Sequence, residues 1–502
     1  MIRRFLLHAL VLSVTAFPVA GQAMAKQNGH RPNIVVVLAD DLGYGDLGCY
    51  GHPRIQSPVI DRLAAEGMRL TSCYAAASNC SPSRTGLMTG RFPQRVGIYN
   101  WIPMFSPMHV RRSEVTVARL LQDVGYQTCQ VGKWHLNGQF NLPTHPQPSD
   151  HGFQHWFSTQ NNALPTHHNP RNFVRNGIPV GPQRGYSAGL VADEAIRWLR
   201  GRDPSSPFFL YVCFHEPHEP INSAPRYRSL YEAPADSTLP NHHGNVTQMD
   251  AALGRLLSTL DRMKLRDNTL LIFTSDNGPA ITRRHPHGSA GPLRDKKGFV
   301  SEGGIRVPGI IHWPGHTRPG DVCDEPVCGV DLLPTLCAVA GAEIPADRTI
   351  DGSSFLPIFT GQQIQRQTPL YWQFNYAQGP SKVAMRSGDW KILATLTGPR
   401  LPPTGHLRQA DQEAIKNAQL ASFELYHLGQ DIAEKNDLAI QEPQQLARMV
   451  QQLQAIYEDV REESPRWPEW TFAGHEGKII NAYYRQQERQ QERQQERKQP
   501  ER

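Results

Sequence analysis

A continuous run of aliphatic, mostly β-branched residues near the start of the chain places the strongest limit on its fold. Residues 33–38 read Asn-Ile-Val-Val-Val-Leu, without the polar residue at every second position that a half-exposed strand would have. The run therefore predicts a strand buried on both faces, as in a parallel sheet covered by helices. Two acidic residues, Asp40 and Asp41, follow at the carboxyl end of this strand.

Apolar strands and amphipathic helices continue to alternate along the chain. Further strand-like runs occur at residues 207–214 and 269–274, and apolar residues at helical spacing occur at 58–68, 115–124 and 246–263. This alternation predicts an α/β domain with a large doubly wound mixed sheet flanked by helices. We expect the domain to occupy residues 26–370.

After residue 370 the pattern changes to short strands with little helix between them. Four apolar segments predict an antiparallel sheet, at residues 370–374, 381–386, 390–396 and 424–428. A helix is expected at residues 443–462, where apolar residues recur at helical spacing. We therefore expect a smaller C-terminal α+β domain over residues 371–480, and two domains suit a chain of 502 residues.

The two ends of the chain differ in composition from the rest. Residues 1–25 combine two arginines, a short apolar run and small residues, which predicts a secretory signal peptide. The apolar run is too short to span a bilayer, so we expect an exported protein, periplasmic or secreted, with no membrane span. Residues 485–502 repeat Arg-Gln-Gln-Glu three times and predict a charged, low-complexity tail with no apolar face.

The charge and the cysteines limit the classes of partner. Of the formal net charge of +6, Arg3 and Arg4 contribute two charges and the C-terminal tail another two. The body of the chain is therefore close to neutral, and we expect no nucleic-acid partner. The eight cysteines show no metal-ligand spacing, but Cys323 and Cys328 are close enough in sequence for a local disulfide.

Acidic and amide side chains follow two of the predicted strands. Asp40 and Asp41 follow the first strand, and Asp276 and Asn277 follow the strand at 269–274. Since strand ends of an open α/β sheet meet at one edge, we expect these four side chains to converge. Three carboxylates would repel one another without a cation, and an oxygen-only set favours Ca²⁺ over Zn²⁺. The alternative is that each pair only forms a turn or caps a helix.

Cys80 precedes a sequence that predicts the start of a helix at Pro82. The free N–H groups at such a start attract an anion, and Arg84 would add further donors in the first turn. A cysteine in this place is either a thiolate nucleophile with a lowered pKa or a small buried apolar residue. The segment alone leaves both readings open.

A set of segments that includes Cys80 resembles a known family. Cys80-Ser-Pro-Ser-Arg84, followed by Leu-Met-Thr-Gly-Arg, resembles the signature of type I sulfatases in the alkaline phosphatase superfamily. Further segments resemble that family in the same order, at residues 39–45, 132–135, 217–220, 274–278, 297–298, 302–308, 385–391 and 424–426. The resemblance covers about residues 31–475, and within the family it is to arylsulfatases and N-acetylgalactosamine-6-sulfatases.

This resemblance implies a metal site and a modified residue. Cys80 would be oxidised to formylglycine, with a formylglycine-generating enzyme as a partner during maturation. The implied Ca²⁺ ligands are Asp40, Asp41, Asp276, Asn277 and the modified Cys80.

The resemblance also implies a role for five further side chains. Arg84 and Lys133 would stabilise the hydrated aldehyde, and His135 would hydrogen-bond it and act as a base. His218 and Lys297 would bind the sulfate, and one of them would protonate the leaving alcohol.

The implied activity is that of a sulfuric ester hydrolase acting on a sulfated carbohydrate or an aryl sulfate. The loops at residues 156–175 and 283–287 lie between the matching segments, and their polar and aromatic residues suit a sugar. Two alternatives stay open. One is a phosphodiesterase or phosphonate monoester hydrolase with the same site. The other is a non-catalytic binder of sulfated glycans, if Cys80 is not oxidised.

Overall fold

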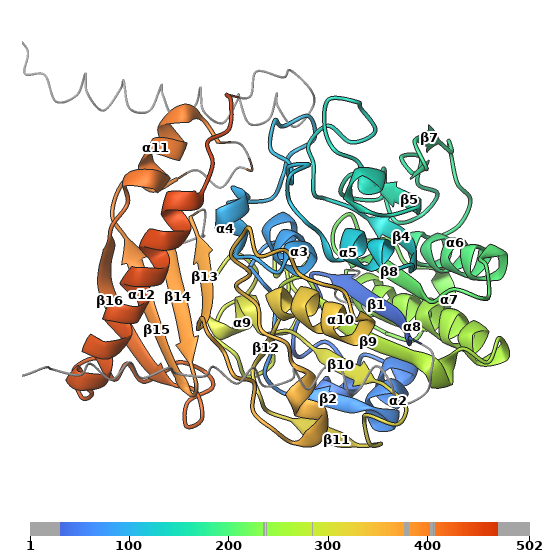
Figure 1. Ribbon diagram of the computed structural model, residues 1–502. Coiled ribbons are helices and arrows are strands. Elements are labelled where there is room, and N and C mark those ends of the chain that lie inside the picture. The colour runs from blue at the N-terminus through green and yellow to red at the C-terminus, as the bar shows by residue number, and fades with distance from the viewer. Residues whose placement is uncertain are drawn as a thin grey trace, which may run out of the picture.

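The computed structural model describes residues 31–233, 236, 238–283, 285–375, 381–401, 405 and 407–469. The predicted signal peptide at 1–25 and the predicted tail at 485–502 lie outside the described residues. Two separate sheets form the framework, one large and mixed, the other small and antiparallel (Figure 1). The predicted fold class is therefore confirmed, while the domain bounds at 370 and 480 stay predictions.

The large sheet has ten strands in the order β11-β2-β10-β9-β1-β8-β4-β5-β6-β7. At its centre, β1 (Asn33–Asp40) lies parallel between β8 (Phe208–Pro217) and β9 (Thr269–Ser275). Every residue of β1 is buried, because alternate side chains enter the cores on opposite faces of the sheet. The prediction of a strand covered on both faces is confirmed.

The outer strands make the sheet mixed. β4 (Gln127–Lys133) and β5 (His155–Thr159) extend the parallel part beyond β8, whereas β10 (Gly309–His312) runs antiparallel to β9. Four short strands complete the two edges: β2 (Met68–Leu70), β11 (Asp321–Cys323), β6 (Val174–Arg175) and β7 (Ile178–Pro179).

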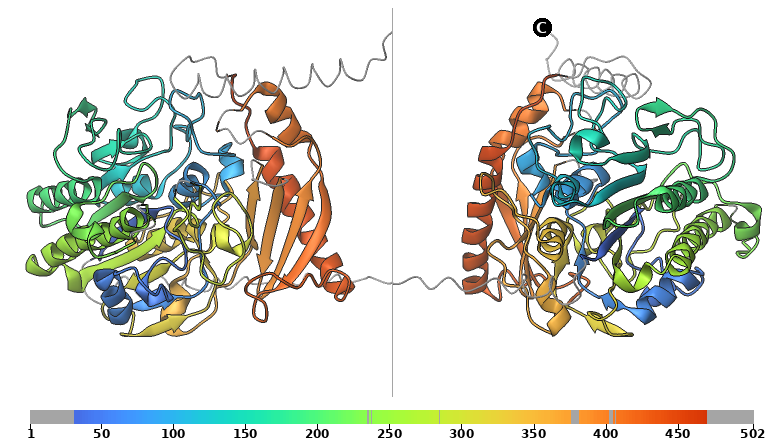
Figure 2. Two further views of the ribbon diagram at one scale, coloured as in Figure 1. Left: turned by 180° about the vertical axis from the view of Figure 1, so that it is seen from behind. Right: turned by 45° about the vertical axis from the view of Figure 1, so that its right-hand side comes forward.

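Helices cover both faces of this sheet (Figure 2). One layer consists of α2 (Pro58–Glu66), α6 (Ser187–Gly201) and α8 (Leu239–Arg262), and the other of α3 (Cys80–Thr89), α5 (Val117–Asp123) and α10 (Leu332–Ala340). The structure places the start of α8 at Leu239, before the predicted start at residue 246. The additional turns contain His242 and His243, which are polar but buried, so apolar spacing did not reveal them.

The small sheet consists of four antiparallel strands beside the large one. These are β13 (Leu370–Phe374), β14 (Lys382–Ser387), β15 (Trp390–Leu396) and β16 (Leu420–His427). A long helix, α12 (Pro443–Glu463), packs against β15 and β16. The first strand also contacts the large domain: Trp372 Nε1 donates a hydrogen bond to Ala75 O at 2.8 Å, and its ring lies 5.2 Å from that of Tyr74.

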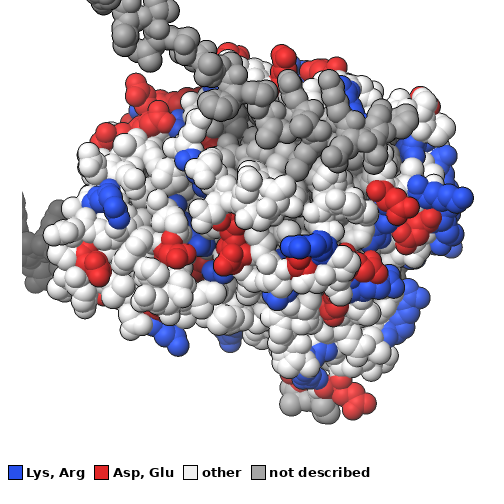
Figure 3. All heavy atoms as spheres, turned by 60° about the horizontal axis from the view of Figure 1, so that its bottom comes forward, with Lys and Arg blue, Asp and Glu red and all other residues white. Residues whose placement is uncertain are grey.

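The surface carries charges of both signs. On the face shown in Figure 3, lysine and arginine side chains are interspersed with aspartate and glutamate. Within the described ranges, no helix is both long enough and apolar enough to cross a membrane.

The cysteines, all of which lie among the described residues, are free. The suggested disulfide between Cys323 and Cys328 is therefore wrong. Cys323 ends β11 at the edge of the large sheet, whereas Cys328 belongs to β12 (Val327–Cys328), which pairs with β3 (Cys73–Tyr74) in a separate two-stranded sheet. Neighbours in sequence thus enter different sheets.

Candidate active site

The carboxyl ends of β1 and β9 bring together the four predicted metal ligands. The Asp41 backbone N–H donates to Asp276 Oδ1 at 3.1 Å, and Asn277 Nδ2 donates to Asp41 Oδ1 at 2.7 Å. Asp40 is fully buried beside them at the end of β1. Asp41 has φ of 66°, a left-handed conformation that non-glycine residues seldom adopt and that often marks a functional site.

Side-chain cations pair with all three carboxylates of this cluster. The pairs are Lys133 Nζ with Asp40 Oδ2 at 2.8 Å, Arg84 Nη2 with Asp276 Oδ2 at 2.7 Å, and Lys297 Nζ with Asp41 Oδ1 at 2.6 Å. Burial raises the pKa of Asp41, but the charges of Lys297 and Lys133 outweigh it and hold that pKa well below its usual range. Burial raises the pKa of Asp276, although the Arg84 charge opposes the rise.

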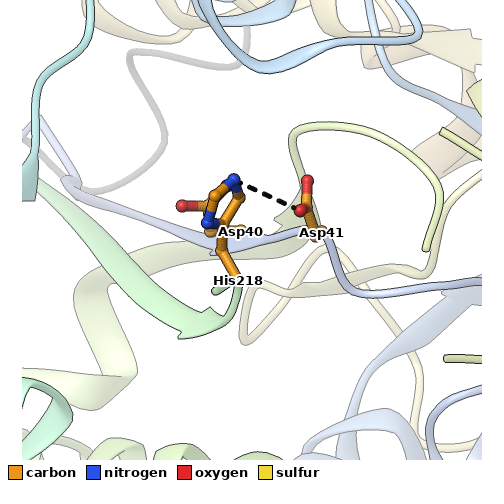
Figure 4. Close-up of side chains that lie close together, drawn as sticks. All are labelled: Asp40, Asp41 and His218. Carbon is orange, nitrogen blue, oxygen red and sulfur yellow. Dashed lines mark ion pairs between the residues drawn. The ribbon is translucent and has the colours of Figure 1, made fainter. Parts of the chain in front are cut away.

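The same cluster has oxygen atoms that suit a cation. Asp40 Oδ1 and Asn277 Oδ1 are buried and accept no hydrogen bond from the described part of the chain. Asp40, Asp41 and His218 also offer ligand atoms that all lie within 4.8 Å of one another (Figure 4). Carboxylate and amide oxygens without donors fit a hard cation such as Ca²⁺.

Cys80 is the first residue of α3, two residues before the predicted helix start at Pro82. Asn79 caps the helix, because its Oδ1 accepts from the Cys80 backbone N–H at 2.8 Å and lies 3.2 Å from Sγ. Cys80 is only 3% exposed. Burial raises the pKa of its thiol, and the charges of Lys133 and Lys297 only partly oppose this. For the unmodified residue, this direction favours the neutral, buried thiol over the thiolate.

His135 lies two residues after the end of β4, and the last turn of the backbone before it requires a glycine at position 132. A Cβ at Gly132, which has φ of 96°, would lie 1.7 Å from Cys213 O. The His135 Nε2–H can donate to Ile102 O at 3.1 Å, while Nδ1 is buried with no partner among the described residues. Burial and the Lys133 charge hold the pKa of His135 well below its usual value. The ring is thus neutral, with Nδ1 free to accept a proton.

His218 follows β8 and faces the carboxylates. Its Nδ1–H donates to Glu219 O, which leaves Nε2 at 3.5 Å from Asp41 Oδ2 (Figure 4). Burial lowers the pKa of His218 to about 3, although the Asp41 charge acts in the opposite direction. His218 is therefore neutral near pH 7 in this arrangement.

A pocket of about 360 Å³ opens over this cluster. Four of the predicted residues line it: Cys80, His135, His218 and Lys297. Arg84 and Lys133 do not line it, and instead hold the buried carboxylates. The aspartates and Asn277 also lie outside its lining.

The pocket wall contains residues that the sequence reasoning missed. Asn79, Asn100, Trp101, Lys296 and Phe374 line it but were not singled out. Phe374 ends β13, so the small sheet contributes to the wall, and no local pattern in the sequence reveals this. Lys296 could have been found, because it directly precedes Lys297.

The loop at residues 156–175 reaches the pocket in part. Asn161 and Asn162 line the pocket, as suits a substrate loop. His167 is instead buried, with Nδ1 3.2 Å from Asn245 Nδ2, and His168 stacks on Tyr186. These two histidines therefore support the fold around the pocket and do not form its wall.

Comparisons with known proteins agree with this geometry. The family model Sulfatase matches residues 32–342, and the model of the N-sulphoglucosamine sulphohydrolase C-terminal region matches 293–394. Arylsulfatase A of Homo sapiens is 36% identical over 459 residues, covering 84% of this chain and 85% of the relative. N-acetylgalactosamine-6-sulfatase of Rattus norvegicus is 35% identical over 393 residues, covering 72% and 71%. The crystal structure of Ps i-CgsB in complex with k-i-k-neocarrahexaose has a TM-score of 0.76 and 28% identity, covering 90% of this chain and 97% of that chain.

Proposed function

Because the chain belongs to the type I sulfatase family, we propose that it hydrolyses sulfate monoesters of carbohydrates, with formylglycine at position 80 and a bound calcium ion. The observation that carries this proposal is the position of Cys80. It starts a helix and lines the pocket, and the charges of Lys133 and Lys297 lower the pKa of its thiol against the effect of burial. The N–H groups at a helix start attract an anion, so a sulfate group in this pocket would meet the side chain at position 80.

Asp40, Asp41, Asp276 and Asn277 would hold the calcium ion, with the modified residue at 80 as a further ligand. The ion would supply positive charge beside the sulfate oxygens as the ester bond breaks. Two buried oxygens without donors support this assignment. The charge of the site supports it as well. Lys133, Arg84 and Lys297 balance the three carboxylates, so without the ion the cluster would have little net positive charge to attract an anion.

Formylglycine in its hydrated form supplies two hydroxyl groups on one carbon, one to attack sulfur and one to release the sulfate afterwards. His135 would accept a proton from this group, since its ring is neutral and its Nδ1 has no other partner among the described residues. The N-terminus of α3 would orient the side chain at position 80, because Asn79 fixes its backbone N–H. Arg84 and Lys133 would act indirectly, because they do not line the pocket but hold Asp276 and Asp40 in place.

His218 and Lys297 would bind the sulfate, and one of them would protonate the leaving oxygen. Burial alone would lower the pKa of Lys297, but the Asp41 carboxylate raises it well above its usual value. The Lys297 ammonium therefore keeps its proton, whereas His218 is neutral near pH 7. Of the two, Lys297 is the group that carries a proton to give.

Maturation and export are part of the same proposal. Cys80 is 3% exposed, so a formylglycine-generating enzyme would have to act before the segment folds. Residues 1–25 would direct export to the periplasm or the medium, consistent with their signal-peptide pattern.

The mass of the peptide that contains Cys80 tests the proposal most directly. We expect an aldehyde in place of the thiol in the purified protein, and turnover of an aryl sulfate that exceeds turnover of an aryl phosphodiester. An unmodified thiol in protein produced with the maturation enzyme would favour the non-catalytic binder. Faster turnover of the phosphodiester would favour the phosphodiesterase alternative.

A further inference from the structure

Among the described residues that line the pocket, Lys296 is a cation that the proposed chemistry does not use. We propose that Lys296 determines specificity by binding a second anionic group on the substrate, a carboxylate or another sulfate, beside the ester that is cleaved. This inference rests on the proposed function, because it concerns the same pocket.

The ion pairing of Lys296 differs from that of the other cations at the site. Arg84, Lys133 and Lys297 each pair with a carboxylate of the cluster. Lys296 Nζ donates a hydrogen bond to Ile281 O at 2.6 Å. Among the described residues, no carboxylate oxygen lies within 4.0 Å of Lys296 Nζ, the distance that defines an ion pair. Its charge is therefore not neutralised by any carboxylate in the described part of the chain.

The surroundings of Lys296 favour an anion from the ligand. The side chain is half-buried and lines the pocket, so it is partly removed from water. A single backbone carbonyl satisfies only part of an ammonium group, which has further N–H groups to donate. Glu219 is bonded to the same loop through residues other than Lys296. Its Oε1 accepts a hydrogen bond from Thr282 Oγ1 at 2.8 Å and lies 3.8 Å from His285 Nε2.

The two consecutive lysines reach different parts of the site. Lys297 extends to Asp41 at the metal cluster, whereas Lys296 extends to Ile281 in the loop after β9. An anion bound by Lys296 would therefore be a group distinct from the sulfate bound by Lys297.

The rest of the wall fits a sugar that connects the two anions. Trp101 and Phe374 offer aromatic surface for a sugar ring, and Asn161 and Asn162 offer amides for its hydroxyl groups. The volume of about 360 Å³ lies in the range of small-ligand pockets and exceeds the needs of a sulfate group alone. The substrate class that this wall selects is a carbohydrate with at least two negative groups.

The test compares Lys296→Gln and Lys296→Arg with wild type on three substrates. These are a hexose 6-sulfate, the same hexose with a second sulfate, and a disaccharide that joins the hexose 6-sulfate to a uronate. We expect Lys296→Gln to lower kcat/KM for one or both dianionic substrates about tenfold more than for the hexose 6-sulfate, mainly through KM. Lys296→Arg should keep most of the preference, because it keeps the charge. The affected substrate identifies the second anion as sulfate or carboxylate.

Controls separate this role from support of the loop. Lys264→Gln removes an exposed lysine after α8 and should leave every kcat/KM unchanged. An equal loss by Lys296→Gln on all three substrates would mean that Lys296 only holds Ile281 or the cleaved sulfate, and would overturn the proposal. No loss on any substrate would overturn it as well.

Binding measurements keep the inference independent of turnover. In a Cys80→Ala background, titration calorimetry with the same three sugars should show the preference for a second anion, and Lys296→Gln should remove it. If the mature enzyme hydrolysed none of the sugars while this preference persisted, the proposed function would fail and the assignment of Lys296 would stand. If the Cys80→Ala protein showed no preference for a second anionic group, the assignment of Lys296 would be overturned.

Discussion

The Lys391 ammonium of β15 lies 2.8 Å from Glu302 Oε1 and joins the small sheet to the segment that carries Lys296 and Lys297. Glu434 Oε1 lies 2.9 Å from the same ammonium, and all three side chains are fully buried. Glu302 also accepts from Tyr74 at 2.6 Å. The segment that carries Lys296 and Lys297 is thus attached to the small sheet and to Tyr74 of β3 by one buried network.

Replacing Lys391 with methionine should destabilise the protein strongly. The change would leave Glu302 and Glu434 buried together without their shared cation, and breaking a buried pair in this way costs about 3–5 kcal/mol. The free energy of unfolding, measured with urea, checks this. Lys382→Met is the matched control on the neighbouring strand β14, where the pair with Glu424 is about a quarter exposed and should contribute about 1 kcal/mol or less. Equal losses for the two variants would contradict the role given to Lys391.

The stability of the protein should fall in acid partly through Glu194. Burial would raise its pKa, but hydrogen bonds from His155 and Arg175 outweigh burial and lower it to about 2, from an ordinary value of 4.5. A lowered carboxyl pKa stabilises the folded state above about pH 4.5, and this contribution is lost as the pH falls towards 2. The free energy of unfolding, measured with urea at several pH values, should be clearly larger for wild type than for Glu194→Gln near pH 6. This difference should shrink below pH 4.5. A constant difference across that range would exclude this origin of the acid sensitivity.

Much of the framework could be predicted because its signals are local. The apolar run before Asp40 and Asp41 is enough to indicate a buried strand, and the acidic residues after it mark the sheet edge. Lys296 could be named as the neighbour of Lys297, but the direction of its side chain could not be predicted, and neither could the place of Phe374 in the pocket wall. Phe374 reaches the pocket because β13 packs against Tyr74 and Ala75 of the large domain, and Lys296 is directed by its hydrogen bond to Ile281 O in the loop after β9. Both depend on tertiary packing that no sequence period encodes.

Removing the metal should abolish turnover and leave most of the fold intact. The cluster of Asp40, Asp41 and Asp276 already has its charges balanced by side-chain cations, so it does not need the ion to stay folded. Chelator-treated enzyme should keep its far-ultraviolet circular dichroism and regain activity with added Ca²⁺. The Tm should rise with Ca²⁺ concentration, since an ion that binds only the folded state stabilises it. Full activity without metal, or a tightly bound zinc ion in the purified enzyme, would disprove the calcium assignment.

Slow release of sulfate should follow from replacing His135. In the mature enzyme, His135→Ala removes the neutral ring whose Nδ1 can accept a proton. Loss of a general base typically costs about 10²- to 10⁴-fold in rate. Rapid-quench measurements should show formation of the alcohol product ahead of free sulfate. Equal slowing of both products would place His135 in the first step instead.

Replacing Cys80 with serine should limit the enzyme to at most one turnover. The introduced serine has a single hydroxyl on its carbon, at the start of α3 and beside the Lys133 and Lys297 charges. That hydroxyl can attack sulfur and displace the alcohol, which leaves a sulfate ester on the serine. It has no second hydroxyl to re-form a carbonyl and expel the sulfate, so the ester should accumulate. A burst assay should give no more than one equivalent of alcohol, and the intact mass should increase by one SO₃ group. Sustained turnover by Cys80→Ser would instead mean that water attacks the ester directly, and that the aldehyde at position 80 is not required.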